Sequence, residues 1–135
     1  MKIRVVPLVV AQFVILSHPL MAADTASEGF TKWWRQFQAA VAAQDAKAVA
    51  RGVHFPVDWE NGSIRKIESA ADLEQHFDQY FTQEIKHNVA SKKPERLPNG
   101  FYLIWWKARG NEYSMSFRPA GSGGFALDAL SEGPP

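Results

Sequence analysis

The sequence predicts an α+β fold in which helices pack on one face of a curved antiparallel sheet of about four to five strands, in the order ααββααβββ. Over residues 30–43, apolar residues recur every three or four positions, as on one face of a helix. From Val53 onward the spacing changes to every second residue, as on a strand. The helical and strand patterns occur in blocks, which is typical of α+β proteins.

The first 23 residues are predicted to be a secretory signal peptide. Lys2 and Arg4 precede an apolar run over 5–16, and the small residues Ala22 and Ala23 follow it. This run is too short for a membrane-spanning helix. We therefore expect cleavage near Ala23 and a periplasmic or secreted protein without a membrane span, with an uncleaved N-terminal anchor as the alternative.

Composition predicts one domain that depends on its apolar core. The chain has 135 residues, 46% of them hydrophobic, and no cysteine, which excludes disulfides and thiol chemistry. We expect a single domain over 24–130 and a disordered tail at 131–135. The formal net charge of +1 becomes near neutral once Lys2 and Arg4 are removed, so nucleic-acid binding is not expected.

The first predicted helix carries one stripe of bulky side chains and ends near residue 43. Thr25 and Glu28 have the spacing of a capping box at its start. Asp45 is placed to cap a short second helix that ends at Gly52. The stripe consists of Phe30, Trp33, Trp34, Phe37, Ala40 and Val41.

A first strand is predicted over 53–59. Its Pro56 lacks an N–H group, which favours an edge position or a bulge. Asn61-Gly62 is a strong hairpin signal and predicts a returning strand over 64–67.

Two further helical segments follow, with caps predicted at Ser69 and Thr82. The first of them should run to about residue 81. The closing strands are predicted over 101–108, 112–118 and 125–130.

This arrangement resembles the nuclear transport factor two-like superfamily, a cone-shaped α+β fold, and more narrowly its small exported bacterial domains of uncharacterised role. The resemblance is carried by the long first helix, the strand entry Val53-His54-Phe55-Pro56-Val57 and the segment Phe77-Asp78-Gln79-Tyr80-Phe81-Thr82. The superfamily contains isomerase-like, dehydratase-like and cyclase enzymes as well as binding modules. The resemblance therefore implies the fold and a ligand pocket between sheet and helices, without implying an activity.

The strand over 101–108 is apolar on both faces, and this predicts a binding surface. Trp105 and Trp106 are neighbours, so they point to opposite faces. Helices can cover only one face. Tyr102, Ile104 and Trp106 are predicted to face outward and bind a partner, because a tyrosine hydroxyl can stay hydrated at such a surface. The alternative is that sheet curvature or the first helix covers both faces.

The inner side is predicted to hold a small apolar ligand pocket, with a filled core as the alternative. Its predicted lining residues are Trp59, Tyr80, Trp105 and Tyr113.

No catalytic residue, metal site or cofactor is predicted. The histidines of the domain, His54, His76 and His87, lack metal-binding spacing, and 121–124 is a flexible loop.

Two functions stay open. The first is an exported, non-catalytic binding or structural module of the cell envelope, acting through the aromatic sheet face or the small apolar pocket. Its partner would be a second copy or an envelope protein, and inhibition of a secreted hydrolase or toxin is a special case. The alternative is a small-molecule isomerase, dehydratase or cyclase with its site inside the cone. That enzyme would use His76 or Asp128 as the base and Tyr80 or Tyr113 as the proton donor.

Overall fold

The structure, a computed structural model, describes residues 26–135, and the predicted signal peptide at 1–23 lies outside the described residues. The helices are α2 (Glu28–Ala42), α3 (Ala46–Arg51), α4 (Ala70–Gln75), α5 (Phe77–Tyr80) and α6 (Gln83–Ser91). The strands are β1 (Val53–Asn61), β2 (Ile64–Ile67), β3 (Glu95–Arg96), β4 (Tyr102–Ala108), β5 (Asn111–Pro119) and β6 (Phe125–Gly133). None of the described helices is both long and apolar enough to cross a membrane.

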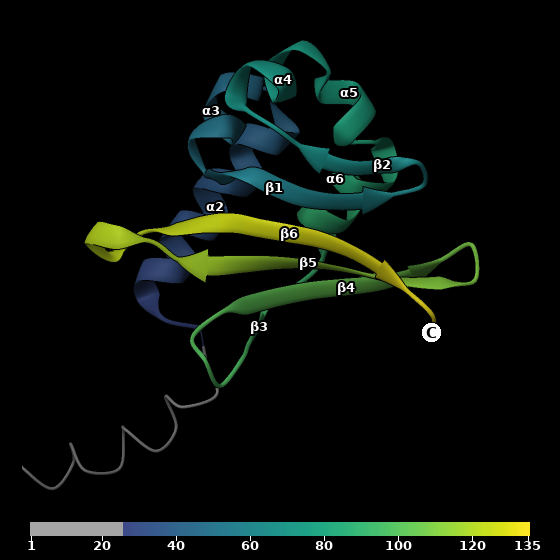
Figure 1. The fold of residues 1–135 in the computed structure, drawn as a ribbon. Coiled ribbons are helices and arrows are strands. Elements are labelled where there is room, and N and C mark those ends of the chain that lie inside the picture. Colours follow the sequence, from purple (N-terminus) through teal and green to yellow (C-terminus); the bar gives the residue numbers. More distant parts are fainter. Residues whose placement is uncertain (1–25) are drawn as a thin grey trace, which may run out of the picture.

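The strands form one six-stranded sheet in the order β2-β1-β6-β5-β4-β3, with the helices on one side of it (Figure 1). The predicted α+β class is confirmed. The predicted four to five antiparallel strands are wrong, because β3 adds a sixth strand and β1 runs parallel to β6. Alternation of apolar residues specifies the two faces of a strand but neither its neighbour nor its direction. That limit explains both errors.

Most helix caps lie where the sequence places them, and the first one does not. Ser27 caps α2, because its Oγ accepts a hydrogen bond from the backbone N–H of Phe30 at 3.0 Å. Thr25, the predicted cap, lies outside the described residues. Asp45, Ser69 and Thr82 each cap the helix that follows them, as expected.

Two boundaries differ from the prediction. The single helix expected to reach residue 81 is interrupted at His76, which ends α4 and precedes α5. The last strand continues to Gly133, so residues 131–133 of the predicted tail belong to the sheet. Pro56 lies within the irregular register between β1 and β6, which confirms the bulge. The strand as a whole has neighbours on both sides, but its pairing with β2 begins at Val57, so Pro56 precedes the part of β1 that β2 covers.

The core forms where α2 crosses the inner face of β4 and β5. The ring of Phe30 stacks on that of Tyr102, with centroids 3.6 Å apart and planes 5° from parallel. Trp34 meets Phe117 edge-on at 5.1 Å. The Tyr102 hydroxyl also accepts a hydrogen bond from the backbone N–H of Ser27 at 2.9 Å, so the start of α2 is tied to β4.

The prediction of which face of β4 points outward is wrong. Tyr102, Ile104 and Trp106 face the helices and are 1%, 1% and 5% exposed, whereas Trp105 points outward and is 42% exposed. The neighbouring strand β5 explains the choice, because directly paired residues share a face. The three buried residues of β4 pair with the apolar residues of β5, and the outward Trp105 pairs with Ser114. The clear alternation of β5 therefore decides the orientation of its ambiguous neighbour.

Two adjacent tryptophans provide a test of this orientation. Trp106→Ala is expected to lower the free energy of unfolding by about 3–5 kcal/mol, because it leaves a cavity in the core. Trp105→Ala is expected to change it by less than about 1 kcal/mol, because that ring is half exposed. Urea denaturation of both variants measures the difference. Equal losses would contradict the orientation of β4.

Candidate functional site

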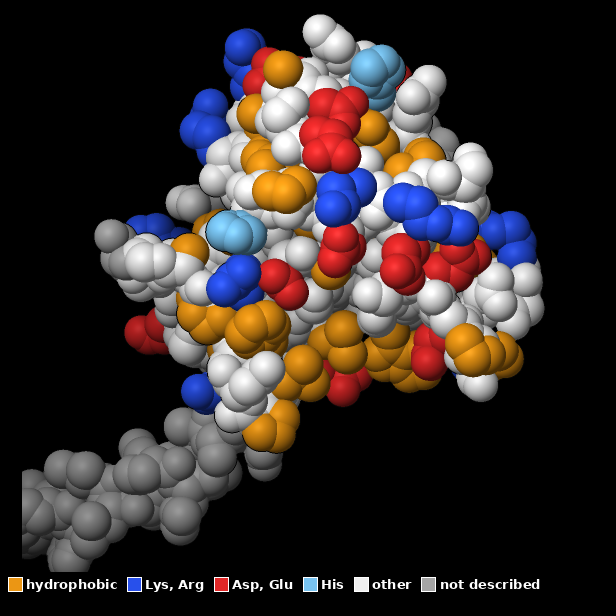
Figure 2. Space-filling model, in the orientation of Figure 1, with side chains coloured by type: hydrophobic (Ala, Val, Ile, Leu, Met, Phe, Trp, Pro, Cys, Tyr) orange, Lys and Arg blue, Asp and Glu red, His pale blue; other side chains and the backbone are white. Residues whose placement is uncertain are grey.

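The outer sheet face, which we define as the side of β4, β5 and β6 that turns away from the helices, carries one large exposed ring. Among the described residues, Trp105 is the exposed large hydrophobic side chain. Its Nε1–H donates a hydrogen bond to the Glu95 carboxylate on β3 at 3.2 Å, which holds the indole in place. Figure 2 shows hydrophobic side chains gathered along the lower edge of the molecule, where β4 lies.

The side chains beside this ring are small. Across the sheet, Trp105 pairs with Ser114, which pairs in turn with Ser131 on β6. The neighbouring row on the same face, two residues along each strand, consists of Leu103, Ser116 and Ala129. The indole therefore stands above a low surface that offers hydroxyl groups for hydrogen bonds.

Charges of both signs border the outer sheet face. Arg118 lies 3.5 Å from the Asp128 carboxylate, which also accepts a hydrogen bond from the Ser116 hydroxyl at 3.4 Å. Lys107 and Glu112 are directly paired residues on β4 and β5. This surface has no single dominant charge, so a strongly charged partner is not favoured.

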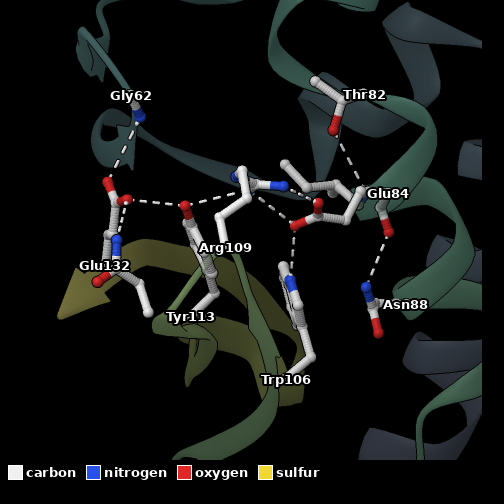
Figure 3. A network of polar contacts seen from close by, with 10 residues as sticks. Gly62, Thr82, Glu84, Asn88, Trp106, Arg109, Tyr113 and Glu132 are labelled. Atoms are coloured by element: carbon white, nitrogen blue, oxygen red, sulfur yellow. Dashed lines mark hydrogen bonds and ion pairs between the residues drawn. The ribbon is translucent and has the colours of Figure 1, made fainter. Parts of the chain in front are cut away.

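A second group of polar side chains closes one end of the core, at the β4–β5 hairpin (Figure 3). Glu84, in the first turn of α6, accepts a hydrogen bond from Trp106 Nε1–H at 2.9 Å. Both of its carboxylate oxygens also accept hydrogen bonds from the Arg109 guanidinium. These contacts fasten α6 to the hairpin.

Tyr113 extends this network across the end of the sheet. Its hydroxyl accepts a hydrogen bond from Arg109 Nη2 at 3.0 Å and donates one to Glu132 at 2.7 Å. Glu132 on β6 also accepts hydrogen bonds from the Asn111 side chain at 3.1 Å and from the Gly62 backbone N–H at 3.4 Å. The network thus joins α6, both hairpins and the last strand, and we call it the hairpin clasp.

The electrostatics of the hairpin clasp favour a structural role. The hydrogen bonds from Arg109 hold the pKa of the Glu84 carboxyl below its usual range, and the hydrogen bond from Tyr113 lowers the pKa of Glu132. Burial raises the pKa of the Tyr113 hydroxyl. At neutral pH both carboxylates are ionised and the phenol keeps its proton. None of these three groups is therefore poised to exchange a proton with a substrate.

An open hollow of about 470 Å³ lies beside the clasp, lined by Glu60, Arg65, Asn111, Glu132, Gly133 and Pro134. Glu60 accepts a hydrogen bond from the Glu132 backbone N–H at 3.0 Å, and Arg65 donates one to the Gly62 carbonyl at 2.7 Å. The principal charged groups of this hollow are therefore already bonded to the protein.

The four predicted ligand-binding residues do not line one pocket. Trp59 is fully buried, packs against Phe81 at 5.2 Å and donates from Nε1–H to the Tyr80 carbonyl at 3.2 Å. Tyr113 belongs to the clasp, and Trp105 lies on the opposite face of the sheet. Only Trp59 and Tyr80 are in direct contact, and that contact uses a backbone carbonyl.

The four groups of the enzyme alternative are also divided between sites. Asp72 accepts hydrogen bonds from the Tyr80 hydroxyl at 2.9 and 3.0 Å and lies 3.2 Å from His76 Nδ1, on the outer surface of α4 and α5. Tyr113 faces inward, whereas Asp128 lies on the outer sheet face. No predicted base therefore shares a cavity with a free phenol. Within residues 26–135 there is no group of three or more potential metal ligands.

The sequence does not reveal Glu84, Arg109 and Glu132 as a connected group. Glu84 has the position expected of an acidic residue at a helix N-terminus, and Arg109 that of a turn residue. The signal for such a group is a buried tryptophan, because its indole N–H needs a hydrogen-bond acceptor nearby. Sequence alone does not show which carboxylate supplies it.

The clasp predicts a specific pH dependence. Glu84→Gln is expected to lower the free energy of unfolding at pH 7 by about 1 kcal/mol, since charged hydrogen bonds are lost at a partly exposed site. A carboxyl whose pKa is depressed by folding stabilises the protein above its unfolded pKa and loses that contribution as the pH falls. The gap between wild type and variant should therefore shrink below about pH 4.5 in urea denaturation. Glu68→Gln, on an exposed glutamate, is the matched control, and a gap that stays constant down to pH 3 would contradict the pairing.

In comparisons with known proteins, no family model, no curated protein and no solved structure matches this chain. The resemblance to the nuclear transport factor two-like superfamily therefore stays a prediction.

Proposed function

We propose that this protein is an exported, non-catalytic binding module of the cell envelope that acts through its outer sheet face. The observation that carries the proposal is the exposure of Trp105, at 42%, on a face that the described helices leave uncovered. Exposed apolar surface favours association, because burying it removes apolar area from water. Export itself rests on the predicted signal peptide.

The surroundings of Trp105 support a binding role. Its indole N–H is already bonded to Glu95, so the ring loses little side-chain freedom when a partner covers it. Tryptophan is among the residues that contribute most to the stability of protein interfaces. Around it, Ser114, Ser116 and Ser131 provide hydroxyls that a partner can use at the rim.

The occupant that this face favours is a second copy of the chain. In a two-fold symmetric contact, both copies use the same surface patch. That patch must therefore be complementary to itself in shape and charge. The outer sheet face meets that requirement, because it carries Lys107 and Arg118 together with Glu112 and Asp128. Two such faces can pack sheet on sheet with their central rings buried.

The enzyme alternative has less support. Its four candidate groups lie on three separate surfaces. The Tyr80 and Tyr113 hydroxyls both donate hydrogen bonds to carboxylates within the protein. An activity inside the cone would require these contacts to break.

Light scattering after size exclusion tests the proposed dimer. We expect the chain to elute with the mass of a dimer at the higher of two concentrations. Trp105→Ser should shift it to a monomer, since the substitution removes the central apolar contact while leaving the core intact.

Gln79→Ser, at an exposed position of α5 on the helix side of the sheet, is the control and should leave the mass unchanged. A wild-type monomer at both concentrations would exclude the second copy and leave an envelope protein as the remaining occupant. A dimer that survives Trp105→Ser would move the contact away from this face.

A further inference from the structure

A hollow of about 380 Å³ lies between α2, α3 and the start of β1. It is lined by Trp33, Gln36, Phe37, Ala48, Arg51 and Gly52. Its volume lies within the range of pockets that hold small ligands, about 300–1,000 Å³. It is separate from the outer sheet face and from the hairpin clasp, and neither of them contributes a residue to it.

One wall of the hollow is aromatic. Trp33 and Phe37 are one helical turn apart on α2, and their rings stack with centroids 5.1 Å apart and planes 16° from parallel. Phe37 is buried, whereas Trp33 is only partly buried and keeps part of its ring accessible. Such a wall favours a ligand with a flat or apolar body.

The floor of the hollow depends on a glycine. A Cβ atom at Gly52 would lie 3.3 Å from the Trp33 ring and 3.4 Å from the Phe37 ring. The glycine carbonyl accepts the backbone N–H of Leu127 at 2.7 Å, so this segment is held against β6 and has little room to retreat. Any larger residue here would press on the aromatic wall.

The rim of the hollow is cationic. Arg51 is exposed at the end of α3, and within residues 26–135 its guanidinium has no hydrogen-bond or ion-pair partner. The Gln36 amide also lines the hollow, and none of the lining residues is acidic. A guanidinium beside an amide donor is suited to bind a carboxylate.

We propose that this hollow binds a small monocarboxylate with a flat or apolar body. The body lies against Trp33 and the carboxylate accepts hydrogen bonds from Arg51 and Gln36. The apolar wall and the single cation together select against two other classes of ligand: neutral analogues, which lack the charge, and simple anions, which lack the body.

Phenylacetate is a suitable probe, with phenylacetamide as its neutral analogue and acetate as the anion without a ring. Titration of the ¹⁵N-labelled chain should give saturable shifts of the Trp33 indole N–H signal, which Trp33→Phe identifies by its loss. Arg51→Gln should weaken phenylacetate binding about tenfold or more, the range expected for loss of a charge-assisted hydrogen bond. Phenylacetamide and acetate should each bind at least about tenfold more weakly than phenylacetate.

Arg96→Gln, an exposed arginine on β3, is the matched control and should bind phenylacetate as the wild type does. Gly52→Ala should weaken binding without removing the charge, provided that its spectrum is that of a folded protein. The proposal is overturned if the wild type shows no saturable binding, if Arg51→Gln binds phenylacetate equally well, or if acetate binds as tightly as phenylacetate.

Discussion

The packing of the α2 aromatic stripe on the inner face of the sheet is the interaction on which the rest of the structure depends. Phe30 lies flat on Tyr102, and Trp34 and Phe37 meet Phe117 edge-on. Without a disulfide, the domain relies on such apolar contacts for its stability. The Tyr102 hydroxyl adds a polar anchor at the N-terminus of the helix, so position along the helix and orientation on the sheet are specified together.

Most of the residues predicted to line an inner pocket are part of the core. Because Trp59 and Tyr113 are buried, these two predicted pocket residues serve instead to hold the layers together. The inward residues of β4, which were predicted to bind a partner, have the same role. The two surfaces that we propose for binding are the outer sheet face and the hollow beside α3. One presents a single indole above small hydroxyl side chains. The other combines an aromatic wall with the Arg51 guanidinium, which has no ion-pair partner among residues 26–135.

The hairpin clasp explains how the two layers stay joined away from α2. Glu84 satisfies the indole N–H of Trp106, which would otherwise be a costly buried donor. Arg109 and Tyr113 then carry the contacts to Glu132, so the far end of the sheet does not open. The outer sheet face, by contrast, is left uncovered by the described helices.

Local patterns were sufficient to predict the α+β class, the caps at Asp45, Ser69 and Thr82, and the hairpin at Asn61-Gly62, because each depends on neighbours within a few positions. They did not determine the parallel pairing of β1 with β6, since strand alternation carries no information about direction. Nor did they determine which face of β4 is buried, because both of its faces are apolar. Pairing with β5 decides that question and leaves Trp105 outside. The contacts of α6 with the β4–β5 hairpin and the pairing of β5 with β6 bring Glu84, Arg109 and Glu132 together from distant segments.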